Sequence, residues 1–208
     1  MSENSHASRG RKCCPKSFCI FCAVISLLII LAVASLIFYF SSRTADDSNA
    51  DSGRMLFFIA RILGYDLASM PADKALFILE TYNHAVRKTA HFTEFAALGF
   101  ALLHFFNICD DLSCMCPGFC FPKPKSGYDG INVVFKTFYS VKPLLVALAL
   151  SVLYAVSDEV HQIFVDGRAF GIYDILIDSA GAVSGISFCL LLRLLTVRAR
   201  RRSAEKTA

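Results

Sequence analysis

Four long apolar runs divide the chain, and each has about the 20 residues that a helix needs to cross a bilayer. They cover residues 18–40, 89–106, 138–157 and 172–195. The third is the weakest, because its uninterrupted apolar core has only 14 residues, and it spans only if Lys142 extends its ammonium to the membrane surface. The pattern therefore predicts an all-α transmembrane bundle of four helices.

The first run is uncharged, is too long for the apolar core of a signal peptide and has no small-residue cleavage site after it. We therefore expect an uncleaved membrane anchor.

Residues 41–53, rich in Ser, Asp and Asn, predict a linker, whereas residues 55–64 are apolar but too short to cross. They predict an outer interfacial or re-entrant helix that stops near Gly64, and Pro71 predicts the start of a helix that runs on toward the second span.

Residues 107–137 are rich in Cys, Pro and Gly and predict a loop. The expected organisation is therefore a basic tail, an anchor helix, a membrane domain and a second basic tail. Their ranges are residues 1–17, 18–40, 55–195 and 196–208.

Charge gives the predicted orientation. With 55% hydrophobic and 18% charged residues, the chain is too apolar for a soluble domain. Lys and Arg gather in both tails and in the connection between the second and third runs, whereas Arg168 is the only basic residue between the third and fourth. Both termini are therefore expected in the cytoplasm. The net charge of +4 does not indicate nucleic-acid binding, because no aromatic and basic face accompanies the tails.

Polar residues gather where three of the predicted spans begin or end. In the second run they recur at i, i+4 and i+7 on one helix face, in the third they form two i, i+3 pairs, and in the fourth one i, i+4 pair. The candidate site residues are Arg87, Lys88, His91, Glu94, Asp158, Glu159, His161, Gln162, Arg168, Asp174 and Asp178. The topology places all of them in one shallow layer at the outer surface.

In this layer, five carboxyl groups face three cationic side chains. Such a site must keep a proton on a carboxyl group, protonate a histidine or bind a cation. An unpaired charge deep in a bilayer costs roughly 2.5–3.5 kcal/mol, so Glu94 and Asp178 should turn inward and find partners. Gly181 and Gly185 form a GxxxG surface for close helix contact. The alternative is that these charges only pair to fix the register of the helices.

Three motifs carry a family resemblance. They are Arg87-Lys88-x-x-His91-x-x-Glu94-Phe95, then Asp158-Glu159-x-His161-Gln162-x-Phe164-x-x-Gly167-Arg168, then Asp174-x-x-x-Asp178-x-x-Gly181. In this order they resemble the VanZ-like family of bacterial membrane proteins over about residues 55–195. The resemblance implies a multi-pass protein of the bacterial cell membrane. The founding member is associated with resistance to teicoplanin, and the family implies no defined reaction.

Two departures from the family pattern stand out. The connection after the second run is long and rich in cysteine, and Asp166 stands where such motifs often have Pro. Four of the nine cysteines, at 109, 114, 116 and 120, lie in or beside this predicted cytoplasmic loop. Disulfides are disfavoured there, and the spacing differs from the paired CxxC of zinc sites. Cys22 and Cys189 are expected to be packing residues.

Three hypotheses for function remain open. In the first, an envelope protein binds a lipid-linked precursor or shields it from an antibiotic, with Arg87, Lys88 and Arg168 contacting pyrophosphate or carboxylate groups. The second is an integral-membrane hydrolase or transferase with a lipid-linked envelope substrate, either metal-dependent or with Glu159 as base and His161 as acid. The third, a proton- or ion-coupled carrier, is weakened by the lack of visible inverted repeats. Metal, cofactor and oligomeric state stay open.

Overall fold

The computed structural model describes residues 16–113 and 141–206, and all of its regular elements are helices. In chain order they are α1 (Lys16–Ser41), α2 (Ala45–Ile62), the short 3-10 helix η1 (Leu67–Ser69), α3 (Ala72–Ser113), α5 (Val141–Gln162) and α6 (Ile172–Lys206). Four of them, α1, α3, α5 and α6, are long and apolar enough to cross a membrane. The predicted all-α fold with four spans is therefore confirmed.

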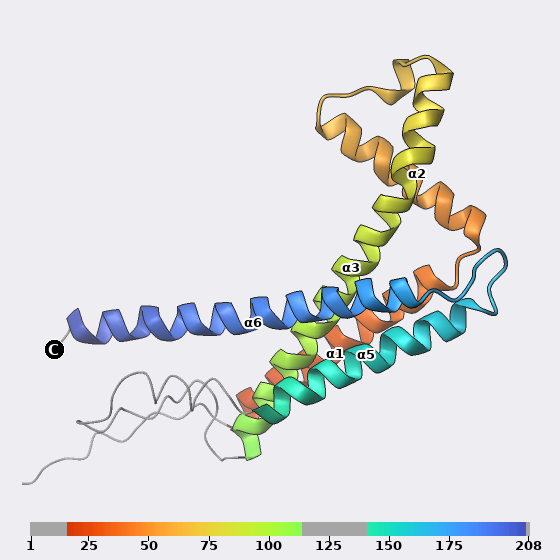
Figure 1. Cartoon of the computed structure of the whole chain (residues 1–208). Helices are drawn as coiled ribbons and strands as arrows, with labels where there is room; N and C mark the ends of the chain where they lie inside the picture. The colour runs from red at the N-terminus through yellow and green to blue at the C-terminus, as the bar shows by residue number, and fades with distance from the viewer. Residues whose placement is uncertain (1–15, 114–140, 207–208) are drawn as a thin grey trace, which may run out of the picture.

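The four spans form a bundle in which α3 packs against α1, α5 and α6 (Figure 1). The beginnings of α1 and α5 lie at one end of the bundle with the end of α3, and the ends of α1 and α5 lie at the other with the start of α6 (Figure 1). Only 17% of the α1 span is buried, so most of its apolar surface is available to lipid. The polar ends of the spans thus meet, as the topology predicts.

An arm made of α2 and the first part of α3 stands away from this bundle (Figure 1). The Thr44 hydroxyl caps α2 by accepting the N–H of Asp47 at 3.2 Å, and Asp46 and Asp47 lie in the first turn. The predicted linker at residues 41–53 is therefore wrong from Ala45 onward. The helix does stop as predicted, because Gly64 follows it with φ +84°.

The continuous helix predicted after Pro71 is confirmed, since α3 runs unbroken from Ala72 to Ser113. It takes up the first residues of the predicted loop at 107–137, and the rest of that loop lies outside the described residues. The same holds for residues 1–15 and for three of the four clustered cysteines, at 114, 116 and 120.

Glycines let α3 and α6 touch backbone to backbone. A Cβ at Gly185 would lie 1.8 Å from the carbonyl oxygen of Ala96, and one at Gly181 would lie 2.3 Å from that of Phe92. The predicted GxxxG contact surface is therefore confirmed. Below it lies an apolar core from all four spans, which includes the predicted packing residue Cys189. Its buried members are Ile37, Phe95, Leu98, Leu102, Leu103, Ala147, Ala155, Ile186 and Cys189.

Candidate functional site

A cavity of about 570 Å³ lies where α5 ends and α6 begins, beside the middle of α3. Eight of the predicted site residues line it: Arg87, Lys88, His91, Glu159, Gln162, Arg168, Asp174 and Asp178. Residues absent from the prediction complete the lining, among them His84, Gly171 and Tyr173. Residues far apart in the sequence thus share one site.

Two adjacent carboxylates of α5 are buried and hydrogen-bonded. Asp158 is 4% exposed and Glu159 is 1% exposed. The Ser41 hydroxyl donates to Asp158 Oδ2 at 2.8 Å, and Gln162 Nε2 donates at 3.0 Å both to Asp158 Oδ2 and to Glu159 Oε1. The N–H of Gly171 donates to Glu159 Oε2 at 2.8 Å. Because these partners satisfy the charged groups, α5 continues to Gln162, past the predicted end of the third span at residue 157.

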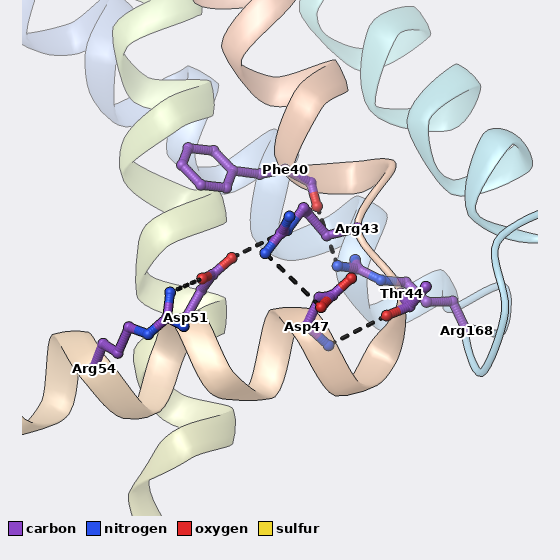
Figure 2. A network of polar contacts seen from close by, with 7 residues as sticks. All are labelled: Phe40, Arg43, Thr44, Asp47, Asp51, Arg54 and Arg168. Carbon is purple, nitrogen blue, oxygen red and sulfur yellow. Dashed lines mark hydrogen bonds and ion pairs between the residues drawn. The ribbon is translucent and has the colours of Figure 1, made fainter.

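The cationic side chains have different partners. Lys88 Nζ pairs with the Asp174 carboxylate and so joins α3 to α6. Arg168 donates to the side-chain oxygen of Gln162 at 3.2 Å. It also donates to the carbonyl oxygen of Phe40 at 3.2 Å (Figure 2). Burial and the nearby Arg87 lower the pKa of the Arg168 guanidinium, which nevertheless stays charged near neutral pH. Arg168 therefore fastens the α5–α6 connection to the end of α1.

A second polar network joins the end of α1 to the arm (Figure 2). Arg43 Nε lies 3.2 Å from Asp51 Oδ2, and Arg54 reaches the other oxygen of Asp51 at 3.2 Å. The N–H of Ala45 donates to the Asp166 carbonyl at 3.1 Å. Beside this network lies a smaller cavity of about 200 Å³, whose lining includes Arg87, His91 and Glu94. Arg87 and His91 therefore face both cavities.

Several buried polar atoms lack a hydrogen-bond partner among the described residues. They are both carboxylate oxygens of Asp178, Oε2 of Glu94, Nδ1 of His91, Nε of Arg168 and the side-chain oxygen of Asn83. Asp178 does turn inward as predicted and is 1% exposed. The predicted pairing of Glu94 and Asp178 with cations is not found there, because Lys88 is held by Asp174.

His161 lies apart from the other site residues. Its Nε2 is 3.1 Å from the Ser42 hydroxyl oxygen, and its ring stacks on Phe38 with 4.7 Å between centroids. It lines neither of the two cavities described above. Spacing on α5 alone could not separate it from Asp158, because the partner that draws it away belongs to α1.

The sequence model of the VanZ/LLP1 family matches residues 24–193. The protein belongs to the VanZ/LLP1 family. No curated protein and no solved structure matches it. The match begins inside α1 and ends at residue 193, so the family region includes most of the first span as well as residues 55–193.

The site predicted from the sequence of this VanZ/LLP1 chain lacked two groups that the first span contributes. Ser41 and the Phe40 carbonyl both contact site residues. One feature of the sequence could have revealed Ser41. This serine directly follows the first apolar run, and the predicted topology of four spans places that end of the run at the same end of the bundle as the other site residues. Chemically, the finished site combines buried carboxylates, the imidazoles of His84 and His91, and three cations.

Proposed function

We propose that this VanZ/LLP1 protein binds the anionic headgroup of a lipid-linked cell-envelope precursor and so contributes to teicoplanin-type glycopeptide resistance. The protein would lie in the bacterial cell membrane with both termini in the cytoplasm and the cavity at the outer face. The observation that supports this most is the cavity of about 570 Å³, which three cationic side chains line at the polar ends of apolar spans. A lipid could keep its tail in the bilayer and place its headgroup there.

Arg87 is the cation best able to contact such a headgroup. Lys88 pairs with Asp174, and Arg168 is bonded to Gln162 and to the end of α1. Among the described residues, Arg87 forms no hydrogen bond or ion pair, yet it lines both cavities. A guanidinium binds phosphate or carboxylate through two parallel hydrogen bonds. The buried carboxyl groups of Glu159 and Asp178, which also line the cavity, would repel an anion. The headgroup should therefore approach from the side of Arg87.

Binding can be measured with the full-length protein in nanodiscs and undecaprenyl-linked precursors. We expect Arg87→Gln to weaken binding at least tenfold, since a hydrogen bond to a charged group contributes about 1.5–3 kcal/mol. Arg54→Gln is the matched control, because Arg54 is exposed on α2 and lines neither of these cavities. Absence of binding by the wild type, or equal binding by both variants, would contradict the proposal.

The cellular test is teicoplanin susceptibility of a deletion strain complemented with these variants. Wild type and Arg54→Gln should restore resistance, whereas Arg87→Gln should not. Equal protein levels in the membrane are the control. Full resistance with Arg87→Gln would refute a role for the cavity.

The proposed orientation is tested by labelling intact cells with a membrane-impermeant thiol reagent. Ala169 is exposed in the α5–α6 connection and suits replacement by Cys, whereas neighbouring Gly167 has φ +75° and would be strained. We expect Ala169→Cys to be labelled from outside and the wild type not, because the predicted topology puts the natural cysteines at or near the inner side. If the variant were labelled only after lysis, the cavity would face the cytoplasm instead of the outside.

A second candidate is an integral-membrane hydrolase or transferase acting on a lipid-linked envelope substrate. The buried carboxyl group of Glu159 on the cavity lining favours it. His91 also lines the cavity and is better placed than His161 to act as an acid. Turnover of an undecaprenyl pyrophosphate-linked precursor by purified protein, lost in Glu159→Gln and kept in His161→Ala, is the expected result. No turnover by the wild type would exclude this candidate for that substrate.

A further inference from the structure

The floor of the cavity holds a carboxylate that the described part of the chain leaves uncompensated. Asp178 is 1% exposed, and neither of its oxygens has a hydrogen-bond partner among the described residues. Nδ1 of His91 is likewise buried without a hydrogen-bond partner among these residues. Burying a charged or polar group without a partner costs several kcal/mol. A ligand that satisfies both groups would remove this cost.

The charge around Asp178 favours a cation as that ligand. Two of the three basic side chains that line the cavity are already engaged, because Lys88 pairs with Asp174 and Arg168 is bonded to Gln162 and to the end of α1. The third, Arg87, forms no ion pair with Asp178 among the described residues. Asp158 brings a second buried carboxylate to the same place. An anion would be repelled there, and a water molecule would leave the two charges unbalanced.

The geometry also fits a single ion. His91, Asp158 and Asp178 each offer a ligand atom, and these three atoms lie within 4.8 Å of one another. Two ligands at about 2.0–2.6 Å from one metal ion can lie up to roughly 4–5 Å apart. The three residues come from α3, α5 and α6, so the folded bundle creates the arrangement.

Asp158 is positioned as a metal ligand would be. Its Oδ2 accepts hydrogen bonds from the Ser41 hydroxyl and from the Gln162 amide. Such outer contacts orient carboxylate ligands and hold them in place when the ion leaves. His91 and Asp178 line the cavity as well, so an ion between them would be open to it.

We propose that His91, Asp158 and Asp178 bind one divalent transition-metal ion, Mn²⁺ or Zn²⁺, at the floor of the cavity. A donor set of one imidazole and two carboxylates suits these ions, whereas soft ions such as Cu(I) prefer thiolates. Two carboxylates and a dication are neutral together. Three protein ligands leave coordination positions for water or for an oxygen of a bound headgroup.

The test uses full-length protein purified in detergent without chelator. Elemental analysis should find one ion per chain, and stripped protein should take up Mn²⁺ or Zn²⁺ in calorimetric titration. We expect Asp178→Asn and His91→Gln each to weaken uptake at least tenfold. Asp166→Asn, the same change at an exposed acid in the α5–α6 connection, should bind as the wild type does.

Thermal stability separates loss of a ligand from loss of the fold. Asp178→Asn keeps the shape and removes the charge, so without metal its Tm should equal or exceed that of the wild type. Added metal should raise the Tm of the wild type and of Asp166→Asn only. Wild type that binds neither ion below about 1 mM, or equal uptake by wild type and Asp178→Asn, would overturn the proposal. No lipid-linked ligand is present, so these results are independent of the proposed function.

Discussion

Replacing Gly185 by Ala should separate α3 from α6. The new Cβ would lie 1.8 Å from the carbonyl oxygen of Ala96 and 2.6 Å from its carbonyl carbon. Carbon and oxygen normally approach to about 3.3 Å, so the helices would have to move apart by about 1.5 Å. No side chain can rotate away, because the atoms in contact belong to backbone. Overpacking costs about 1–3 kcal/mol or more, and Ala returns about 1 kcal/mol of helix propensity.

We therefore expect Gly185→Ala to lower the free energy of unfolding by about 2 kcal/mol. SDS titration of the protein in mixed micelles measures it. Gly53→Ala is the matched control: its Cβ would meet only the tip of the Leu79 side chain, at 3.6 Å, an ordinary contact. It should raise the stability by up to about 1 kcal/mol. If Gly185→Ala were as stable as the wild type or more stable, α3 and α6 would not be in backbone contact at Gly185.

Three further predictions concern the site and use the same titration. Ser41→Ala removes the hydroxyl that donates to buried Asp158 and should cost about 1.5–3 kcal/mol; an unchanged stability would show that this bond is not formed. A double-mutant cycle with Lys88→Met and Asp174→Ala should show a coupling energy of about 1 kcal/mol, because these paired side chains are only 19% and 28% exposed. A coupling energy of zero would refute the ion pair. Gly167→Ala forces a side chain into φ +75° and should cost about 1–2 kcal/mol; a neutral result would mean that the turn has another conformation.

The spans and their common polar end were predictable because hydrophobicity and bilayer thickness fix them. With four spans that alternate in direction, the end of α5, the start of α6 and the start of the second span in α3 lie on the same side of the membrane. The acids of α5 and α6 therefore meet the basic residues of α3. The glycines at 181 and 185 were also readable, since their spacing of four leaves one face of α6 without side chains.

Other features depended on partners that spacing does not specify. Residues 45–53 looked like a linker because they are polar, although Thr44 and the acids after it are a helix start signal that outweighs composition. Asp158 and His161 share a helical spacing, but Ser41 holds one and Ser42 with Phe38 holds the other. That separation appears only once α1 is packed beside α5.

The unbroken course of α3 has a mechanical consequence. Its 42 residues make a rod about 60 Å long with no proline inside it. Lys88 and His91 lie on this rod between its start, which packs against α2, and the place where Gly181 meets the backbone of Phe92. A load on the start of α3 would act through a lever with that glycine contact as its fulcrum. It would move Lys88, four residues from the contact, away from Asp174 on α6 without melting a single helical turn, whereas His91, next to the contact, would move little.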